Sequence, residues 1–188
     1  MALDYQYTPL DQATKSIRII KLYPAAAPEE TLCCEILTED FLAPSSHPYE
    51  AISYTWDGQV PSPDHAISCA IKEDGSVREE ALQLTKNSSE ALRRFRLRHG
   101  FRLLWIDSVC IDQSNPQEKS HQVVLMSEIY AHAKLVLVWL GPDPTSNGKR
   151  IFDFLAACAA LDPDKEKERG QLIELVAEIE ARKFHPAS

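Results

Sequence analysis

The sequence predicts an α/β fold whose core is a parallel strand–helix–strand unit. Two continuous apolar runs, FRLLWID at residues 101–107 and KLVLVWLG at 134–141, have the character of strands buried on both faces. A helix with well-marked ends lies between them, and strands connected in this way are usually parallel. Shorter strands precede this unit and two helical segments follow it. We therefore expect a parallel sheet flanked by helices, with an N-terminal β extension and C-terminal helices.

The helix between the two apolar runs has the clearest ends in the chain. Asn115 is the expected N-cap, and Pro116 occupies the first turn, where its missing N–H costs nothing. Glu118 is the expected acid of a capping box. Side chains that recur at helical spacing predict the buried stripe of this helix: Gln122, Leu125, Met126, Ile129 and Ala133.

Three strands are predicted in the first part of the chain. SIRIIK at 16–21 and TLCCEIL at 31–37 are expected to pair across the PAAAPEE turn. YEAISYTW at 49–56 is the third strand. The segment DGQVPSPD at 57–64 contains two prolines and a glycine, which predict an exposed loop.

A hairpin and a helix are predicted next. HAISCAIK at 65–72 and a weaker run at 81–85 lie on either side of an EDGS turn, as in a hairpin or its remnant. The segment NSSEALRRFRLRHG then predicts a helix that begins with Asn87 as its N-cap and ends at Gly100. Glu90, three residues after the cap, completes the expected capping box.

The C-terminal part of the chain predicts two more helices. KRIFDFLAACAAL at 149–161 is one, and DKEKERGQLIELVAEIEARKF at 164–184 is an amphipathic, charge-rich second one. The apolar stripe of the second helix has no evident partner and comprises Leu172, Leu175, Val176 and Ile179. We expect one main domain at residues 1–162 and a C-terminal helical segment at 163–188 that is truncated from a longer protein.

The composition is that of a soluble globular protein. Of the 188 residues, 44% are hydrophobic and 26% are charged. The formal net charge of −8 argues against a nucleic-acid partner, because the surface as a whole would repel phosphate. The arginines between residues 93 and 102 are expected to form the solvated face of a helix rather than a phosphate site.

The cysteines indicate a reducing, cytoplasmic environment. There are five of them, an odd number, and none forms a CxxC pair. The N-terminus has no apolar signal segment, and no run approaches the roughly 20 apolar residues that span a bilayer. The cysteines and histidines show no metal-ligand spacing, so we expect no metal site and no membrane span.

Polar side chains gather where the first apolar run ends and the next helix begins. Asp107 ends the predicted strand, and Asp112 and Gln113 lie in the loop that leads into the helix. Ligands of open α/β sheets bind outside the carboxyl ends of the strands, and a helix N-terminus attracts anionic groups. A polar ligand site is therefore predicted here. The alternative is that the loop side chains bond backbone amides, while Trp105 and Cys110 belong to the core.

Four blocks of the sequence resemble the heterokaryon incompatibility (HET) domain of filamentous fungi. In order, they are YEAISYTW at 49–56, NSSEALRRFR at 87–96, LLWIDSVCIDQ at 103–113 and EKSHQVVLMSEIYAHAKLVLVWLG at 118–141. The recognisable core of the resemblance is residues 49–142, about half of the chain.

The sequence departs from the family's pattern at two points. Asp57 stands between Trp56 and Gly58, where the family usually has the glycine directly after the tryptophan, so this loop is expected to differ in backbone conformation. Ser88 follows Asn87, where the family usually has leucine.

The resemblance implies a cell-death effector of fungal allorecognition, an innate immune function. It also implies a remotely TIR-like fold, with a flavodoxin-like parallel sheet flanked by helices. In that comparison AISY is the first TIR strand, LLWID the second and KLVLVWLG the third.

Some TIR domains cleave NAD with a glutamate on the helix after the third strand. The equivalent helix here is expected at 149–161 and its only acid is Asp153, so that glutamate is not matched and enzymatic activity is a hypothesis. If the domain cleaves NAD as a substrate, the candidate catalytic acids are Asp107, Asp112 and Glu128. Trp56 or Trp105 would stack on a ring of the ligand. The alternative for Glu128 is an ordinary exposed position on a helix.

Two further hypotheses come from the same residues. Cys110 with His121 or His132 would form a nucleophile–base pair, although a buried cysteine is commonly just a small apolar residue. In the non-enzymatic alternative, Tyr54 and Trp56 anchor an interface in a TIR-like assembly module. Its partners would be second copies of the domain or other incompatibility proteins, including NLR-type proteins. The full set of ligand-binding or interface candidates is Tyr54, Trp56, Trp105, Cys110, Gln113 and Gln122.

Overall fold

A computed structural model of the chain describes residues 3–11, 13–73 and 75–143, together with isolated residues of the C-terminal part, namely 148, 152, 153 and 156. The chain divides into two compact units, Met1–Gly141 and Pro142–Ser188. The two predicted C-terminal helices lie outside the described residues, apart from those isolated positions. The fold of the first unit is described below.

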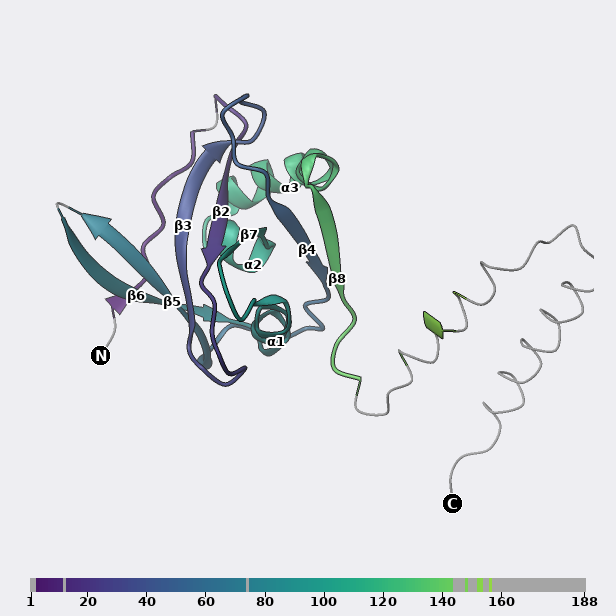
Figure 1. The fold of residues 1–188 in the computed structure, drawn as a ribbon. Coiled ribbons are helices and arrows are strands. Elements are labelled where there is room, and N and C mark those ends of the chain that lie inside the picture. The colour runs from purple at the N-terminus through teal and green to yellow at the C-terminus, as the bar shows by residue number, and fades with distance from the viewer. Residues whose placement is uncertain are drawn as a thin grey trace, which may run out of the picture. The chain divides into compact units, whose positions relative to one another are not determined.

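The first unit is built on one mixed sheet with three helices (Figure 1). The strands lie in the spatial order β1-β6-β5-β3-β2-β7-β4-β8. Their bounds are Leu3–Asp4 (β1), Ser16–Leu22 (β2), Leu32–Asp40 (β3), Glu50–Tyr54 (β4), Ser62–Glu73 (β5), Ser76–Leu84 (β6), Arg102–Trp105 (β7) and Leu135–Trp139 (β8). The helices are Lys86–Phe95 (α1), Asp107–Cys110 (α2) and Pro116–His132 (α3).

The predicted parallel unit forms one end of this sheet. β4 pairs in parallel with β7 on one side and with β8 on the other. Across the sheet these three strands therefore lie in the order β7, β4, β8, which is second, first, third in their order along the chain. On the other side of β7 the sheet continues through antiparallel β2. The sheet is thus mixed rather than wholly parallel, and the expected N-terminal β extension is continuous with the parallel strands.

Both predicted strand pairs of the N-terminal half are present. β2 and β3 are antiparallel, with Ser16 opposite Asp40 and Leu22 opposite Cys34. β5 and β6 form the expected hairpin, but β5 begins inside the segment predicted as a loop. The register of that hairpin shifts between Ser62 and Ala66. Pro63 lies in this irregular stretch, where its missing N–H breaks no regular ladder.

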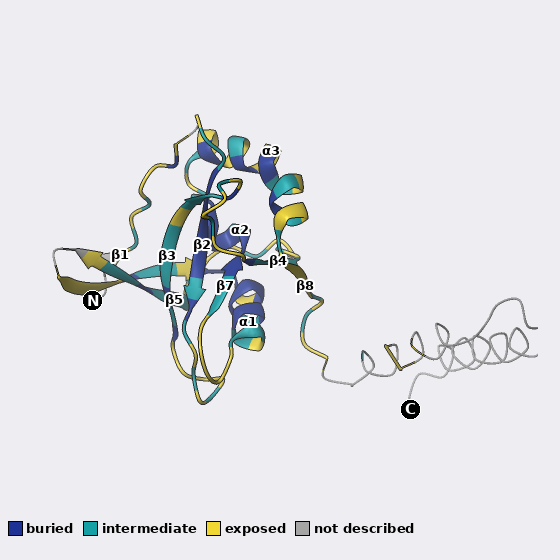
Figure 2. Ribbon diagram, turned by 45° about the horizontal axis from the view of Figure 1, so that its top comes forward, coloured by how far each residue is buried: buried dark blue, intermediate teal, exposed yellow. Residues whose placement is uncertain are grey.

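The sheet is bent around its helices. α1 lies against both β4 and β5, which are separated by three strands in the sheet, and α2 lies against both β2 and β6. Figures 1 and 2 show α3 and α1 at opposite ends of the sheet, with α2 between them. Because helices and strands cover it, the central strand β2 is buried along almost its whole length.

The ends of α1 differ from those predicted. Its N-cap is Thr85, whose hydroxyl oxygen accepts a hydrogen bond from the N–H of Ser88 at 3.1 Å. The prediction that Asn87 caps the helix through a box with Glu90 was wrong. The helix also ends at Phe95, well before Gly100. Threonine is also a favoured N-cap residue, although it ranks below asparagine, so residue type pointed to the wrong one of the two positions.

The start of α3 is as predicted, except for its acid. Asn115 accepts hydrogen bonds from the N–H groups of Gln117 and Glu118, and Pro116 occupies the first turn. The side chain of Glu118, however, does not return to Asn115 as a capping-box acid. It forms a buried ion pair with Arg18 of β2, and the exposed fractions of the two side chains are 7% and 1%.

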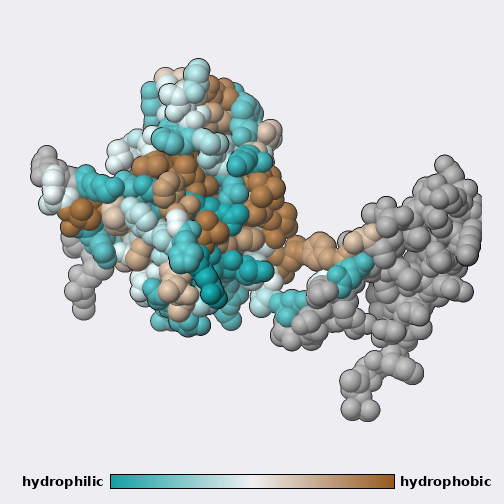
Figure 3. Space-filling view, in the orientation of Figure 1, coloured by the Kyte–Doolittle hydropathy of each residue, from teal (hydrophilic) through white to brown (hydrophobic). Residues whose placement is uncertain are grey.

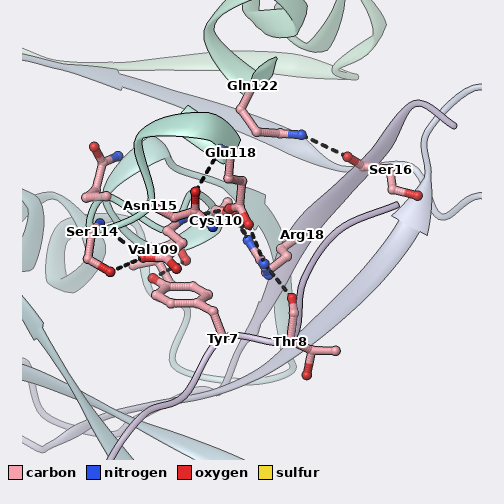
Figure 4. Close-up of polar contacts among 12 residues, drawn as sticks. Tyr7, Thr8, Ser16, Arg18, Val109, Cys110, Ser114, Asn115, Glu118 and Gln122 are labelled. Carbon is pink, nitrogen blue, oxygen red and sulfur yellow. Dashed lines mark hydrogen bonds and ion pairs between the residues drawn. The ribbon is translucent and has the colours of Figure 1, made fainter. Parts of the chain in front are cut away.

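Arg18 and Glu118 are the centre of a buried polar network (Figure 4). Two nitrogens of the guanidinium group donate to the two carboxylate oxygens, at 2.6 and 3.0 Å. The guanidinium group also donates to the carbonyl oxygens of Thr8 and Cys110, and Glu118 accepts from the N–H of Asp112 at 2.8 Å. The network therefore joins the N-terminal segment, β2, the end of α2 and the first turn of α3.

The predicted burial of the last strand was wrong. β8 lies at one end of the sheet order and pairs only with β4 among the described residues. Val138 is 58% exposed, and Leu135, Val136 and Leu140 are exposed as well. Hydrophobic surface lies along this side of the unit (Figure 3), where Figure 2 shows exposed residues. A continuous apolar run does not distinguish a covered strand from an uncovered edge strand.

The ion pair yields a prediction about stability. Replacing Glu118 by glutamine leaves the Arg18 guanidinium buried without its counter-charge, so Glu118→Gln should lower the free energy of unfolding by about 3–5 kcal/mol. The control is Glu128→Gln, because the ion pair of Glu128 with Lys15 is about two-fifths exposed and should contribute less than about 1 kcal/mol. Urea denaturation measures both. Equal losses in the two variants would contradict this role of the Arg18–Glu118 pair.

Candidate functional site

The carboxyl ends of the three parallel strands meet at one edge of the sheet. Asp107 follows β7 as the first residue of α2, Tyr54 ends β4, and Trp139 ends β8. Trp56 lies two residues beyond β4. β4 lies between β7 and β8, so the strand order reverses at β4. The carboxyl edge at such a reversal is where α/β sheets bind ligands.

Trp56 and Asp107 are the central pair of this edge. The indole Nε1–H of Trp56 donates a hydrogen bond to Oδ2 of Asp107 at 2.8 Å. The ring of Tyr54 stacks on that of Trp56, with ring centroids 6.4 Å apart and planes inclined by 25°. An aromatic pair and a carboxylate from two neighbouring strands are thereby held together.

The loop that carries Trp56 is a tight turn. Asp57 and Gly58 both have positive φ, 49° and 66°, and the N–H of Gln59 donates to the carbonyl oxygen of Trp56 at 2.8 Å. Positive φ at both central positions is the pattern of a type I′ turn, which Asp-Gly favours. Asp57, the residue that departs from the family's usual pattern, thus occupies a left-handed position in this turn.

Asn87 connects this loop to the other strands. Its amide nitrogen donates to the carbonyl oxygen of Thr55 at 2.6 Å, and its amide oxygen accepts from the indole N–H of Trp139 at 2.7 Å. The backbone N–H of Asn87 donates to the side chain of Gln59 at 2.9 Å. Asn87 is buried, so these bonds fix the loops after β4 and β8 against the start of α1.

Buried polar atoms lie beneath Trp56. The hydroxyl groups of Tyr54 and Ser108 and Oδ1 of Asp107 are buried close to one another, and hydrogen bonding with Tyr54 opposes the rise in the pKa of Asp107. Burial, and then the charge of Asp107, raises the pKa of Tyr54, and the hydroxyls of Ser108 and Ser88 act on it in the opposite direction. The three groups therefore form a buried polar cluster at the carboxyl edge of the sheet.

The pKa of Asp107 is raised. Burial of the carboxyl group is the largest cause, and the hydrogen bond from Trp56 opposes it. The net effect is that the folded protein disfavours the carboxylate form of Asp107. Carboxyl groups perturbed in this way are common at functional sites.

A pocket of about 240 Å³ opens beside this pair. Asp107 and Trp56 form one wall, and Gln113 is fixed next to them by a 2.9 Å bond from its side-chain N–H to the Asp107 carbonyl. Met126 and Val123 of α3 supply an apolar wall. Lys119, also on α3, is exposed in this pocket and supplies its positive charge. The pocket therefore combines an aromatic ring, an acid, an amide and a cation.

The predicted acid Asp112 lies elsewhere. It lines a second pocket of about 370 Å³ together with Tyr5, Tyr7 and Ser114, and Gln113 lines both pockets. One oxygen of Asp112 accepts bonds from the N–H and the hydroxyl of Ser114, at 3.0 and 2.6 Å. Asp112 thus bonds its own loop, as the alternative in the sequence analysis proposed, and it does not lie beside Asp107 in the first pocket.

The remaining candidates do not line the first pocket. Glu128 of α3 forms an ion pair with Lys15, which precedes β2. Gln122 is buried, and its side chain donates to the carbonyl oxygen of Ser16 at 3.0 Å. Trp105 is a core residue whose ring meets that of Tyr130 edge to face, with the ring centroids 5.4 Å apart.

Cys110 is not arranged as a nucleophile. Its side chain is fully buried, and burial raises the pKa of its thiol to about 12, so the thiol is protonated at neutral pH. His132 bonds the carbonyl oxygen of Glu128 at 2.9 Å instead of approaching Cys110. In the described part of the chain, no group of three or more metal-ligating side chains comes together.

Several residues of this edge were missed from the sequence. Ser108 was not predicted, Ser88 was noted only as a departure from the family's pattern, and Asn87 was predicted to be a helix cap because asparagine is so common there. Trp139 could have been found, because the rule that placed Asp107 at a strand's carboxyl end applies equally to β8. The ion pair of Arg18 joins segments a hundred residues apart, and no local pattern indicates it.

The chain belongs to the heterokaryon incompatibility (HET) protein family. The family model matches residues 49–185, which include every strand and helix that forms the carboxyl edge just described. The chain is also similar to heterokaryon incompatibility protein 6, OR allele, of Neurospora crassa, with 36% identity over 157 residues. The match covers 81% of this chain but only 22% of that relative. No solved structure shows significant similarity. In the described residues, no helix is both long and apolar enough to cross a bilayer.

The raised pKa of Asp107 predicts a pH-dependent stability difference. The stabilising contribution of a group with a raised pKa is fully present below its unfolded pKa and is lost as pH rises through its folded pKa. Asp107→Asn keeps an acceptor for Trp56 but removes the buried charge. The variant should therefore be more stable than the parent at neutral pH, and the difference should vanish in acid.

Urea denaturation at a series of pH values measures this difference. The matched control is Asp64→Asn, because Asp64 is exposed and its side chain makes no described bond. Its stability relative to the parent should not change in the same pH range. A destabilised Asp107→Asn protein at neutral pH would show that the carboxylate is needed for folding.

Proposed function

We propose that this chain is the effector module of a fungal incompatibility protein, in which it triggers cell death during non-self recognition. Membership of the HET family and the similarity to heterokaryon incompatibility protein 6 support this proposal. The reducing cytoplasm is the proposed location, in keeping with free Cys33, Cys34, Cys69 and Cys110. Because the chain spans 22% of that relative, sensing and regulation are assigned to other parts of such proteins.

The chemistry proposed for the module is cleavage of NAD at the Trp56–Asp107 pocket. The observation that carries it is a carboxyl group of raised pKa, bonded to an indole, in a pocket with an exposed lysine. Trp56 would stack on a ring of the dinucleotide, and Lys119 would face its pyrophosphate. A flavodoxin-like or TIR-like fold is proposed with it, and the spatial order second, first, third of the three parallel strands supports that fold, because the flavodoxin-like strand order begins in the same way.

Asp107 is the proposed catalytic residue. As the glycosidic C–N bond breaks, its electron pair leaves with nicotinamide, which becomes neutral, and positive charge develops on the ribose. A carboxylate beside the ribose stabilises that charge. Asp107 would then accept a proton from the attacking water, a task that suits a group whose pKa lies closer to neutrality than that of an ordinary aspartate.

Nicotinamide release by the purified domain tests this reaction. Asp107→Asn should reduce turnover by about a hundredfold or more, as expected for loss of a general base. Asp112→Asn and Glu128→Gln are matched controls, because their carboxylates lie outside the pocket, and they should retain most of the activity. Absence of turnover in folded protein at every concentration, including the assembled state, would refute NAD cleavage.

Assembly without catalysis is the second candidate function, and the exposure of β8 favours it. Among the described residues, β8 pairs along one edge only, and several of its apolar side chains are exposed, including Val136 and Val138. Such an edge pairs readily with another strand unless something protects it. In this alternative the module would act by joining a second copy or another incompatibility protein of the NLR type.

Self-association of the purified domain tests the assembly function. Val138→Lys places a charge on the β8 edge and should convert an associating protein to a monomer in sedimentation velocity experiments. Val77→Lys is the control, because Val77 is similarly exposed, at 64%, but lies on β6 at the far side of the sheet. If the parent is monomeric throughout, or if both variants behave alike, β8 is not the assembly surface.

A further inference from the structure

A third pocket, with a chemistry unlike that of the first two, lies at the opposite end of β7 from Asp107. Its volume is about 320 Å³, and it lies between the last turn of α1 and the loop that joins β2 to β3. The loop contributes the small residues of the segment 25–28. All the other lining side chains are arginines: Arg93, Arg94, Arg96 and Arg98. None of the described residues that line this pocket is acidic, although the whole chain has a net charge of −8.

Two of the arginines are held in place by the loop. Arg93 donates to the carbonyl oxygens of Pro28 and Glu30, at 2.7 and 2.8 Å. Arg96 donates to four carbonyl oxygens of the same loop, including that of Thr31 at 2.9 Å. These bonds use both terminal nitrogens of Arg96 and one terminal nitrogen of Arg93. A guanidinium group has five N–H donors, so donors on Nε of both groups and on the second terminal nitrogen of Arg93 are left over.

The other two arginines are free to bind. Arg94 and Arg98 are exposed, and neither makes a hydrogen bond or ion pair with the described residues. The pocket thus combines two arginines of fixed orientation with two that can move towards a ligand. Fixed guanidinium groups lose little freedom on binding, because their orientation has already been set.

Within the part of the chain that the structure describes, acidic side chains offset the positive charges of this pocket only weakly. The pKa of Arg96 is lowered, first by burial and then by the charge of Arg93. Glu30 and Glu29 act in the opposite direction but more weakly. The carboxylate of Glu30 accepts a bond from the N–H of Ala27 at 2.7 Å, so it supports the loop. A bound anion would remove the repulsion between the arginines.

We propose that this pocket binds a small, soluble polyphosphate, with its phosphate groups on the four arginines. Guanidinium groups bind phosphate oxygens through paired, charge-assisted hydrogen bonds, and several in one pocket favour ligands with two or more phosphates. The arginines were expected from sequence to be merely a solvated helix face. In the structure, however, the four arginines and the β2–β3 loop line one pocket, so a single ligand can contact all four. The site does not depend on the function proposed for Asp107, which lies at the other end of β7.

Isothermal titration calorimetry with inorganic pyrophosphate tests the site on the purified chain. We expect saturable binding of one pyrophosphate per chain, weaker binding of orthophosphate, and an affinity that falls as salt is added. Titration with ATP shows whether the site accepts the phosphates of a nucleotide. Arg94→Gln/Arg98→Gln should weaken pyrophosphate binding by at least about tenfold, because each charge-assisted contact is worth about that factor. These two side chains hold no other residue, so the fold should be retained.

Two controls complete the test. Lys86→Gln removes one positive charge from the start of α1, far from the pocket, and should leave pyrophosphate affinity nearly unchanged. Asp107→Asn should bind pyrophosphate as the parent does, so failure of the NAD hypothesis and failure of this site are distinguishable. No saturable binding by the parent chain, or equal losses in Lys86→Gln and in the double arginine variant, would overturn the proposal.

Discussion

The buried ion pair between Arg18 and Glu118 is the interaction on which the rest of this fold depends. A guanidinium group in the centre of a sheet is tolerated only if its charge and its N–H donors are all satisfied. Here one carboxylate pairs with the charge, and it and two carbonyl oxygens accept hydrogen bonds from the two terminal nitrogens of Arg18; these acceptors come from three separate parts of the chain. Since Glu118 also accepts from the N–H of Asp112, the pair fixes the loop that begins at Asp107 and carries Gln113. Burial of a charge in β2 thereby orders the edge where the candidate site lies.

That edge is organised by side chains that bond across strands. The Trp56–Asp107 bond joins the ends of β4 and β7, and Asn87 joins the ends of β4 and β8 through Thr55 and Trp139. The Trp56–Asp107 and Asn87–Trp139 bonds link residues about fifty positions apart, and the Asn87–Thr55 bond links residues about thirty positions apart. The arrangement therefore exists only in the folded protein. The family match covers this whole region, whereas the arginine pocket includes loop residues that precede the match. The two sites are therefore separate in structure as well as in chemistry.

Local signals predicted local structure well. The cap at Asn115, the β2–β3 and β5–β6 pairs, and the strand–helix–strand unit all rest on short patterns of turn residues and apolar spacing, and all are present. The predictions that were wrong concerned residues whose structural role depends on partners far away in the sequence. Glu118 had the sequence position of a capping acid, but a buried arginine a hundred residues earlier is a stronger partner for it. KLVLVWLG is apolar enough for a buried strand, yet only the sheet order reveals that nothing described covers it. Of the candidate acids, Asp107 follows directly from a strand end, while Asp112 bonds its own loop.

The strand order has a consequence for how the protein is made. β4 pairs with β8, so Glu50 must wait for Leu135, 85 residues later, before that side of the strand is covered. Pairings between residues so far apart in sequence form late, because a long loop must close first. The Trp139 indole that anchors Asn87 leaves the ribosome after every other group of the carboxyl edge. An unfinished or prematurely ended chain that stops before Trp139 therefore carries Trp56 and Asp107 without the strand that completes their surroundings. A cell making this module does not encounter the assembled site until synthesis has passed that residue.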